Sequence, residues 1–327
     1  MNATIRGLGI TVVIGLLVSL AICLLLEPTA GYSSPGPSHF TWVRAIPEGQ
    51  GDWPRFTQMV VGFGDKLWAV EPAAPQKFAF TSADGVRWTR TPANAAWGER
   101  YRPAVAFFKG RMWFFGGRSG TVQNPTFHDD VWSSENGADW KRVTPSAGWT
   151  PRWDHSALIF GDKLWVLGGF GRDGYADDIW FTPDGVNWTR ATEKAPWSKW
   201  KYRSFVVFRD RIWAIGFHVG NDVWSSSDGA NWQQATPNAG WPASSRYKHA
   251  VVFQGLLWVM GGADAKGNFE NDVWLSTDGV RWEQFTPRAP WNPRAANYSV
   301  VFQKKLWIFG GKNADDDAWY LFHKEQL

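Results

Sequence analysis

Cysteine is almost absent from this chain of 327 residues, which contains only Cys23, inside an apolar N-terminal run. The chain beyond that run therefore has no disulfide and no thiol chemistry. Histidine is scarce as well: the six histidines show no close pairing of the kind that a metal site requires. The Gly-x-Ser-x-Gly, His-Glu-x-x-His and phosphate-loop motifs are also missing. We therefore predict no catalytic residue, no metal and no cofactor.

A strong excess of one charge is also lacking. The formal net charge is +4, and the lysines and arginines are scattered along the chain, which argues against nucleic-acid binding. After residue 40, no stretch has the period of an amphipathic helix. The sequence therefore predicts an all-β domain.

One long uncharged run is present, at residues 7–26, and it is long enough to span a bilayer. Arg6 precedes it, and the possible cleavage site after it, Pro28-Thr29-Ala30, is a poor match to a small-x-small exit. We expect residues 1–27 to be an uncleaved signal-anchor with Arg6 on the cytoplasmic side of the membrane. We expect residues 28–39 to be a flexible tether. Cleavage would instead give a secreted protein. Both readings place the remaining chain outside the cytoplasm, in the periplasm or at the cell surface.

Tryptophan, by contrast, is abundant: the chain contains 25. "NDVWLSTDGVRWEQFTPRAPW", from Asn271, has close copies that begin at Asp129, Asp177 and Asn221, and a decayed copy begins at Lys77. The tryptophans recur with a period of about fifty residues, so the chain is a repeat. A residue that is used at the same place in every unit is most simply a packing residue.

Each unit divides into four short strands, named A to D here. Strand A is an apolar run such as residues 155–160, a two-residue polar turn such as Gly161-Asp162 leads to strand B, and a variable loop leads to strand C. Asp-Gly or Asn-Gly then joins strand C to strand D, and we expect a type I′ hairpin turn there. Four-stranded antiparallel units repeated radially make a β-propeller.

The units number six, and the chain ends indicate how the ring closes. The last unit has strands A, B and C but no strand D before Leu327. Residues 39–53 read as a strand D without a preceding A, B and C. We therefore predict a six-bladed β-propeller over residues 40–327, closed by this N-terminal strand pairing with residues 318–323, which covers two open strand edges.

The chain at this point resembles the kelch-repeat family, in the bacterial style described as galactose-oxidase-like. Four units carry the glycine pair that ends strand B, followed by Asp/Asn-Asp-Val/Ile-Trp, as at Gly168-Gly169; two units depart from it, with Glu71-Pro72 and Gly216-Phe217. The resemblance implies a kelch propeller over residues 40–327. It does not carry over the copper chemistry of galactose oxidase, because that site needs a tyrosine cross-linked to a cysteine.

Variable loops on a rigid scaffold are where binding sites usually lie, and nearly all length variation here is in the B–C and D–A connections. These connections share one face, around the expected central channel. They carry arginines interleaved with aromatic residues and histidines, which could hold a carboxylated sugar or an acidic peptide. The candidate ligand-binding residues are Arg100, Arg152, Trp153, His155, Trp200, Arg203, His218, Arg246, Tyr247, His249 and Arg294.

A structural role competes with this interpretation. The arginines recur in step with the repeat and could pair with the Asp/Asn-Asp that opens strand C, and His155 and His249 could be hydrogen-bonded structural residues. Trp153 and Trp200 fall outside the repeat pattern and are therefore the better ligand contacts.

Two functions follow from these residues. The first is a non-catalytic, membrane-tethered scaffold that binds a carbohydrate or an exported or cell-surface protein. The alternative is a sialic-acid-type mutarotase or epimerase, a class that also resembles a six-bladed exported kelch propeller. It would need acid–base groups near an arginine that holds the carboxylate, and the sequence offers Glu71, Glu99, His155 and His218 without selecting among them.

Overall fold

The computed structural model describes residues 39–47, 60–71, 78–93, 95–121, 123–197, 202–217, 220–242, 247–295, 298–311 and 317–326. All of them belong to one compact unit, residues 34–327. The predicted signal-anchor and all of the predicted tether except His39 lie outside the described residues. Within the described ranges, no helix is long and apolar enough to cross a membrane.

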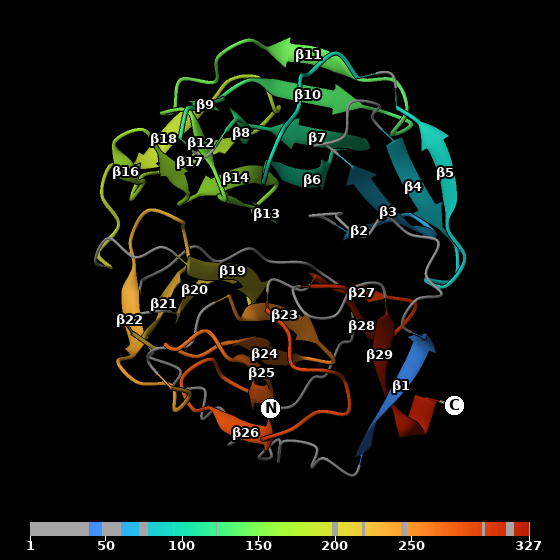
Figure 1. Ribbon diagram of the computed structural model, residues 1–327. Helices are drawn as coiled ribbons and strands as arrows, with labels where there is room; N and C mark the ends of the chain where they lie inside the picture. Colours follow the sequence, from blue (N-terminus) through green and yellow to red (C-terminus); the bar gives the residue numbers. More distant parts are fainter. Residues whose placement is uncertain are drawn as a thin grey trace, which may run out of the picture. The chain divides into compact units, whose positions relative to one another are not determined.

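The described chain is an all-β, propeller-like structure of four-stranded antiparallel sheets (Figure 1). A short 3₁₀ helix, η2 (Lys324–Gln326), follows the last strand. The first three sheets are β2 (Val60–Phe63), β3 (Lys66–Glu71), β4 (Phe78–Ser82) and β5 (Thr89–Pro92); β6 (Ala104–Phe108), β7 (Arg111–Phe115), β10 (Val131–Ser134) and β11 (Lys141–Thr144); and β13 (Ser156–Phe160), β14 (Lys163–Leu167), β17 (Ile179–Thr182) and β18 (Thr189–Thr192).

The remaining four-stranded sheets repeat this order. They are β19 (Tyr202–Phe208), β20 (Arg211–Phe217), β21 (Val223–Ser226) and β22 (Gln233–Thr236); β23 (His249–Phe253), β24 (Leu256–Ala263), β25 (Phe269–Ser276) and β26 (Glu283–Thr286); and β27 (Tyr298–Phe302), β28 (Lys305–Phe309), β29 (Ala318–His323) and β1 (Phe40–Ile46). The last sheet thus takes its fourth strand from the start of the described chain: β1 pairs antiparallel with β29, with Phe40 opposite His323 and Arg44 opposite Trp319.

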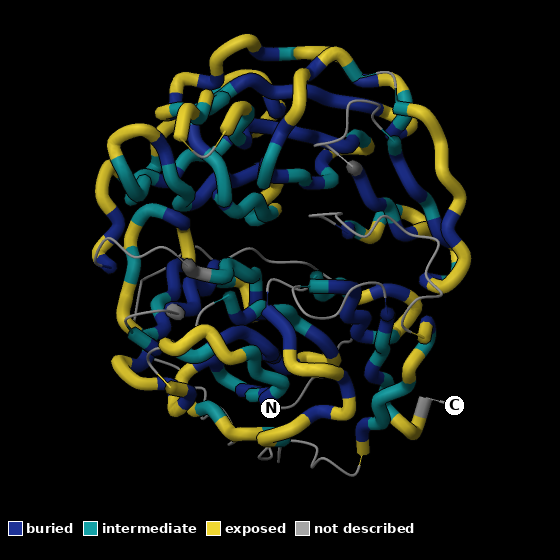
Figure 2. The backbone as a smooth tube through the Cα atoms, viewed as in Figure 1, coloured by how far each residue is buried: buried dark blue, intermediate teal, exposed yellow. Residues whose placement is uncertain are grey.

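The first strand of each sheet lies innermost. Strands β2, β6, β13, β19, β23 and β27 contact one another in that order, and β27 contacts β2. Burial follows the same arrangement (Figure 2): the B strands, such as β14, are almost wholly buried, whereas the outer D strand β5 is exposed throughout. The variable loops add two small sheets at one end, formed by β8 (Arg118–Gly120) with β9 (Pro125–Phe127), and by β12 (Arg152–Trp153), β15 (Phe170–Gly171) and β16 (Gly174–Tyr175).

Tryptophans on the B strands join neighbouring sheets. The Trp113 indole donates a hydrogen bond to the carbonyl of Phe108 in its own sheet, at 2.9 Å. Its ring lies against Gly185 of the next sheet, where a Cβ atom would be only 2.0 Å from the ring. The same contact recurs for Trp68 with Gly137, Trp165 with Gly229, Trp213 with Gly279, and Trp307 with Gly85. The repeated tryptophan is therefore a packing residue, because its ring needs a facing residue without a side chain.

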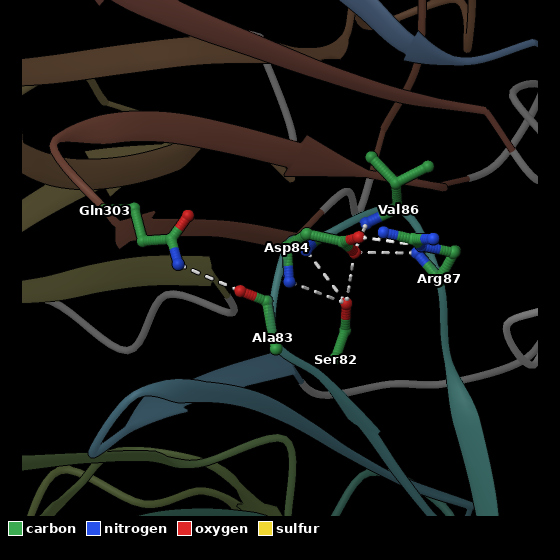
Figure 3. Close-up of polar contacts among 7 residues, drawn as sticks. Ser82, Ala83, Asp84, Val86, Arg87 and Gln303 are labelled. Atoms are coloured by element: carbon green, nitrogen blue, oxygen red, sulfur yellow. Dashed lines mark hydrogen bonds and ion pairs between the residues drawn. The ribbon is translucent and has the colours of Figure 1, made fainter.

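The turns differ from the sequence-based prediction. In the C–D turns only the glycine has a positive φ, as at Gly85, so these are not type I′ turns and that prediction was wrong. The Ser82 hydroxyl accepts a hydrogen bond from Gly85 N, and the Asp84 carboxylate accepts from Val86 N and Arg87 N, each at 2.8 Å (Figure 3). These side-chain bonds stabilise a longer loop than a two-residue hairpin.

The A–B turns have the type I′ geometry instead. Both central residues have positive φ in five of the six A–B turns. These pairs are Lys109-Gly110, Gly161-Asp162, Arg209-Asp210, Gln254-Gly255 and Gln303-Lys304. Their twist suits the two strands that they join.

Candidate functional site

Three of the repeated arginines, Arg100, Arg152 and Arg294, are held by the chain's own carboxylates. Arg152, at the start of β12, is 1% exposed and makes two hydrogen bonds to Asp178, at 2.6 and 2.9 Å. It also donates to the carbonyls of Gly168 and Thr150. Burial raises the pKa of the Asp178 carboxyl, but the hydrogen bonds and charge of Arg152 bring that pKa below its usual value.

Two further candidates repeat this arrangement. Arg100 contacts Asp130 at 2.7 Å, and Arg294 makes two hydrogen bonds to Asp317, at 2.6 and 2.9 Å. Arg294 is fully buried and Arg100 is 4% exposed. These guanidinium groups link the end of strand B to the start of strand C, which is the structural role considered above.

In the fifth sheet a lysine takes this place. Lys248 contacts Asp272 at 2.5 Å and the carbonyl of Gly261 at 2.8 Å, and Glu270 lies 3.1 Å from its ammonium group. The sequence pattern had suggested Arg246 for this position. Arg246, Trp200, His218 and the side chain of Arg203 lie outside the described residues.

Two of the three candidate histidines, His155 and His249, lie within the described residues and are poorly placed to exchange protons with solvent. His155 is 6% exposed, and neither ring nitrogen has a hydrogen-bond partner among the described residues. Burial, aided by the nearby charge of Arg152, lowers the pKa of His155 to about 3. Burial likewise lowers the pKa of His249 to about 4, and its Nδ1 also lacks a partner within the described chain. Both imidazoles are therefore neutral at ordinary pH.

Trp153 is the candidate that takes part in an accessible cluster. The Arg118 guanidinium, on β8, lies 4.7 Å from the centre of the Trp153 ring and 4.9 Å from that of Tyr101. Arg118 is half-buried, and its guanidinium donates a hydrogen bond to the Gly120 carbonyl at 3.3 Å. It has no carboxylate partner among the described residues. We call Tyr101, Arg102, Arg118, Trp153 and Asp154 the Arg118 cluster.

The backbone fixes this cluster from two neighbouring sheets. Arg118 and Tyr101 exchange backbone hydrogen bonds at 2.7 and 3.0 Å, while Trp153 pairs with Phe170 on β15. Arg102 bridges the two sheets through an ion pair with Asp154, at 2.8 Å, and both residues have left-handed backbone conformations. Left-handed conformations are costly for residues other than glycine, and they tend to persist at functional sites.

One carboxylate borders the cluster. The exposed Glu99 accepts a hydrogen bond from the Tyr101 hydroxyl at 2.6 Å. This bond is the largest of the effects that raise the pKa of the Tyr101 phenol above its usual value. Of the four acid–base candidates from the sequence, Glu99 is the one placed beside the cluster, because His155 is buried and the Glu71 side chain and His218 lie outside the described residues.

A cleft of about 620 Å³ lies beside the Arg152–Asp178 pair and is also lined by Tyr175, Arg190 and Glu193. Its two arginines already face carboxylates: Arg152 bonds to Asp178, and Arg190 lies 3.8 Å from Glu193. Its remaining cation, Lys194, is exposed and has no aromatic ring beside it among the described residues. The described residues contain no group of three or more histidine, cysteine or acidic side chains placed to hold a metal. The Arg118 cluster, with its unpaired cation, is therefore the better candidate for ligand contact.

Sequence reasoning missed Arg118 and Arg102. Arg118 directly follows the glycine pair Gly116-Gly117 and opens the longest B–C loop, and this cation at the base of a variable loop was the available signal. Arg102 carried no signal, because its partner Asp154 belongs to the next repeat.

Comparison with known proteins agrees with the fold. A family model described as "DUF6242 beta propeller domain" matches residues 182–293. A solved structure entitled "Structure of YjhT" is similar with a TM-score of 0.65 and 17% sequence identity, over 84% of this chain and 95% of that one. No curated protein matches the sequence. The chain is thus similar to β-propellers in fold.

Proposed function

We propose that this chain is a six-bladed kelch-type propeller that binds a carboxylate-bearing glycan at the Arg118 cluster without catalysing a reaction on it. The ring is supported by the six four-stranded sheets, the contacts among their innermost strands and the pairing of β1 with β29. The kelch assignment is supported by the glycine pairs and the Asp–Trp motif of the sequence.

The apolar run at residues 7–26 tethers this propeller to a membrane, outside the cytoplasm, in the same proposal. Protease added to intact cells or spheroplasts will digest the propeller if it lies outside. Protection of the propeller until the cells are lysed would reject this part of the proposal.

The single observation that carries the binding proposal is the state of Arg118. Its guanidinium lies over two aromatic rings and has no acid partner among the described residues, whereas Arg100, Arg152 and Arg294 are all paired. Guanidinium pairs with carboxylate through two parallel hydrogen bonds, and aromatic faces pack against sugar rings. A ligand with both features, an acidic sugar, satisfies the whole cluster.

The test is an array of acidic and neutral glycans probed with the full-length chain in detergent. We expect an acidic glycan to bind, and Arg118→Gln to weaken its binding by about tenfold or more, because a charge-assisted hydrogen bond contributes about 1.5–3 kcal/mol. Trp153→Ala should also weaken it. Arg190→Gln is the matched control, since Arg190 is an arginine 6.0 Å from the Trp180 ring that lies outside the cluster.

Two results would reject the proposal. One is equal affinity for acidic and neutral glycans, and the other is an Arg118→Gln variant that binds the acidic glycan as tightly as the wild type does. Capture of an exported protein through the same residues would assign the site to an acidic protein segment instead.

A mutarotase is the alternative, favoured by one contact: Glu99 reaches the cluster through Tyr101. A carboxylate beside a carboxylate-binding arginine is the minimum set for acid–base chemistry on an acidic sugar. Interconversion of sialic acid anomers, followed by NMR, decides between the two. Acceleration by the wild type that Glu99→Gln abolishes would establish the enzyme.

A further inference from the structure

The six A–B turns together carry a net positive charge as large as that of the whole chain. We call residues 64–66, 109–111, 161–163, 209–211, 254–256 and 303–305 the cationic collar. It contains eight lysines and arginines and three aspartates, a net charge of +5, whereas the whole chain has +4. The cations are Lys66, Lys109, Arg111, Lys163, Arg209, Arg211, Lys304 and Lys305.

The collar surrounds the centre of the structure at one end. Its turns follow the innermost strands, each of which has Cα atoms within 8 Å of strands on either side. The C–D turns lie further out at the same end and have the opposite charge, with six acidic and two basic side chains over 83–88, 135–140, 183–188, 227–232 and 277–282. The surface is thus positive at its centre and negative at its edge.

Most of the collar charge is not neutralised by a neighbour. Arg111 pairs with Glu135, but within the described chain no other collar cation has a carboxylate partner. Lys66 and Lys304 are exposed, and Lys109 donates to a backbone carbonyl, that of Pro183, which leaves its charge in place. Unpaired cations in five of the six turns attract an anion that reaches the centre.

The backbone under these cations is strained. Arg209, Asp210, Gln303 and Lys304 occupy the central positions of type I′ turns with φ between 48° and 58°. Asn-Gly is the residue pair that fits such turns best, and other residues there cost on the order of 1 kcal/mol each. Arg209 and Lys304 thus place long cationic side chains at positions where asparagine or glycine would be less strained.

Apolar side chains stand beside the cations. Ile159 and Val301 are 38% and 39% exposed and lie one residue before the end of β13 and β27, next to the turns. A phosphate ion would make no favourable contact with these apolar side chains. A peptide with both acidic and apolar side chains would contact both groups.

We propose that the cationic collar is a docking surface for an acidic, partly apolar peptide segment of a partner protein. The segment binds at the centre, where its carboxylates meet the lysines and arginines and its apolar side chains cover Ile159 and Val301. The outer ring of acids repels a broad anionic surface such as a lipid bilayer, because screening beyond about 8 Å lets each charge act locally. This surface is at the opposite end of the strands from the Arg118 cluster, so the two proposals stand independently.

The test uses the full-length chain in zwitterionic detergent and a short labelled peptide of repeated Glu-Glu-Leu, followed by fluorescence anisotropy. The variant replaces Arg209 and Lys304 together by asparagine, which suits the left-handed turn positions. We expect peptide affinity to fall by about tenfold, with an unfolding midpoint equal to or above that of the wild type. Loss of binding in a protein that is no less stable separates the docking role from a folding defect.

Lys194→Asn with Lys266→Asn is the matched control, since both lysines are exposed but lie outside the collar. The wild type should bind Glu-Glu-Leu more tightly than a Lys-Lys-Leu peptide, and salt should weaken that binding. Equal affinity for the two peptides, or unchanged affinity in the collar variant, would overturn the proposal. So would collar-dependent binding to vesicles of phosphatidylcholine and phosphatidylglycerol that exceeds binding to the peptide.

Discussion

His155 is a buried titratable side chain whose effect on stability can be measured. It packs against Phe115, with ring centres 5.6 Å apart, and its nitrogens have no partner within the described chain. Its pKa is about 3 in the fold and about 6.5 when unfolded. The unfolded chain therefore binds a proton between pH 6.5 and 3 that the folded chain does not. We expect His155 to lower the free energy of unfolding by about 1.4 kcal/mol per pH unit as pH falls through that window.

His155→Leu removes this proton linkage while filling a similar volume. At pH 7.5 the free energy of unfolding of the variant, measured with denaturant, should lie within about 1 kcal/mol of the wild-type value. On going to pH 5 the wild type should lose about 2 kcal/mol relative to the variant. His249→Leu gives a comparison over a narrower window, because the pKa of His249 is about 4. If the wild-type and His155→Leu stability curves run parallel from pH 7.5 to 5, the imidazole is not buried in its neutral form.

At this scale the sequence predicted which residue types lie on the face and offered two roles for the arginines, pairing with aspartate or ligand binding, without deciding between them. The period-fifty spacing of Arg100, Arg152 and Arg294 indicated a repeated role, and the Asp pairs in step with them indicated the partners. The sequence did not predict that Lys248 takes the arginine's role in the fifth sheet. The lysine stands at a different position in the repeat, yet it contacts the equivalent partners, the Asp272 carboxylate and the Gly261 carbonyl. Arg118 was missed because it occurs in one loop only, and a single residue has no periodicity.

Among the elements, the C–D turn of each sheet is fixed by the tryptophan of its neighbour. Gly185 has φ of +81°, and a Cβ atom there would be 2.0 Å from the Trp113 ring. Gly185→Ala should therefore cost about 2 kcal/mol or more, from backbone strain together with displacement of a buried ring. Gly161 is the matched control: it is also left-handed, at +55°, but has open space around its Cβ position. Gly161→Ala should cost only about 1 kcal/mol in chemical denaturation. Equal losses for the two variants would show that the ring moves aside freely.

The turn types show where local sequence rules fail. Asp-Gly is the usual signal for a type I′ hairpin, but a serine or threonine two residues earlier supplies a hydroxyl for the glycine amide, as Ser82 does for Gly85. That bond favours the longer loop over a type I′ hairpin. Asp-Gly is compatible with both turns, and the preceding hydroxyl residue selects the longer one. The A–B turns were correctly placed by the apolar pattern on either side, although Arg209-Asp210 and Gln303-Lys304 lack the residues that usually mark type I′ geometry.

At the scale of the whole molecule, the repeat made the sheets predictable, because the units share the same strand order and nearly the same tryptophans, with Phe80 as an exception. The inserted strands β8, β9, β12, β15 and β16 were not predicted, since they lie in the loops where the units differ. The candidate site is built from those same loops. Its position on one face followed from strand alternation, whereas its chemistry required the contacts between two sheets.

The pairing of β1 with β29 leads to a prediction about the cooperativity of the entire fold. Phe40 is 5% exposed, and its ring lies 5.1 Å from that of Trp258, the repeated tryptophan of the neighbouring sheet. Phe40 thus packs against a tryptophan that in the other sheets packs against a turn glycine. Gln303 likewise donates to the Ala83 carbonyl at 2.8 Å, which links the last sheet to the first (Figure 3). Phe40→Ala should lower the free energy of unfolding by about 3–5 kcal/mol, as for other buried phenylalanines.

In a closed ring every sheet has two neighbours, so this loss should shift the unfolding transition of the whole domain. Far-ultraviolet circular dichroism and tryptophan fluorescence should report one common midpoint for the variant, as for the wild type. Val186→Ala is the control, since Val186 is 42% exposed in a C–D turn and should change little. An open array loses cooperativity from its ends, so a Phe40→Ala variant that unfolds in two separated steps, with only the terminal sheets lost first, would contradict ring closure.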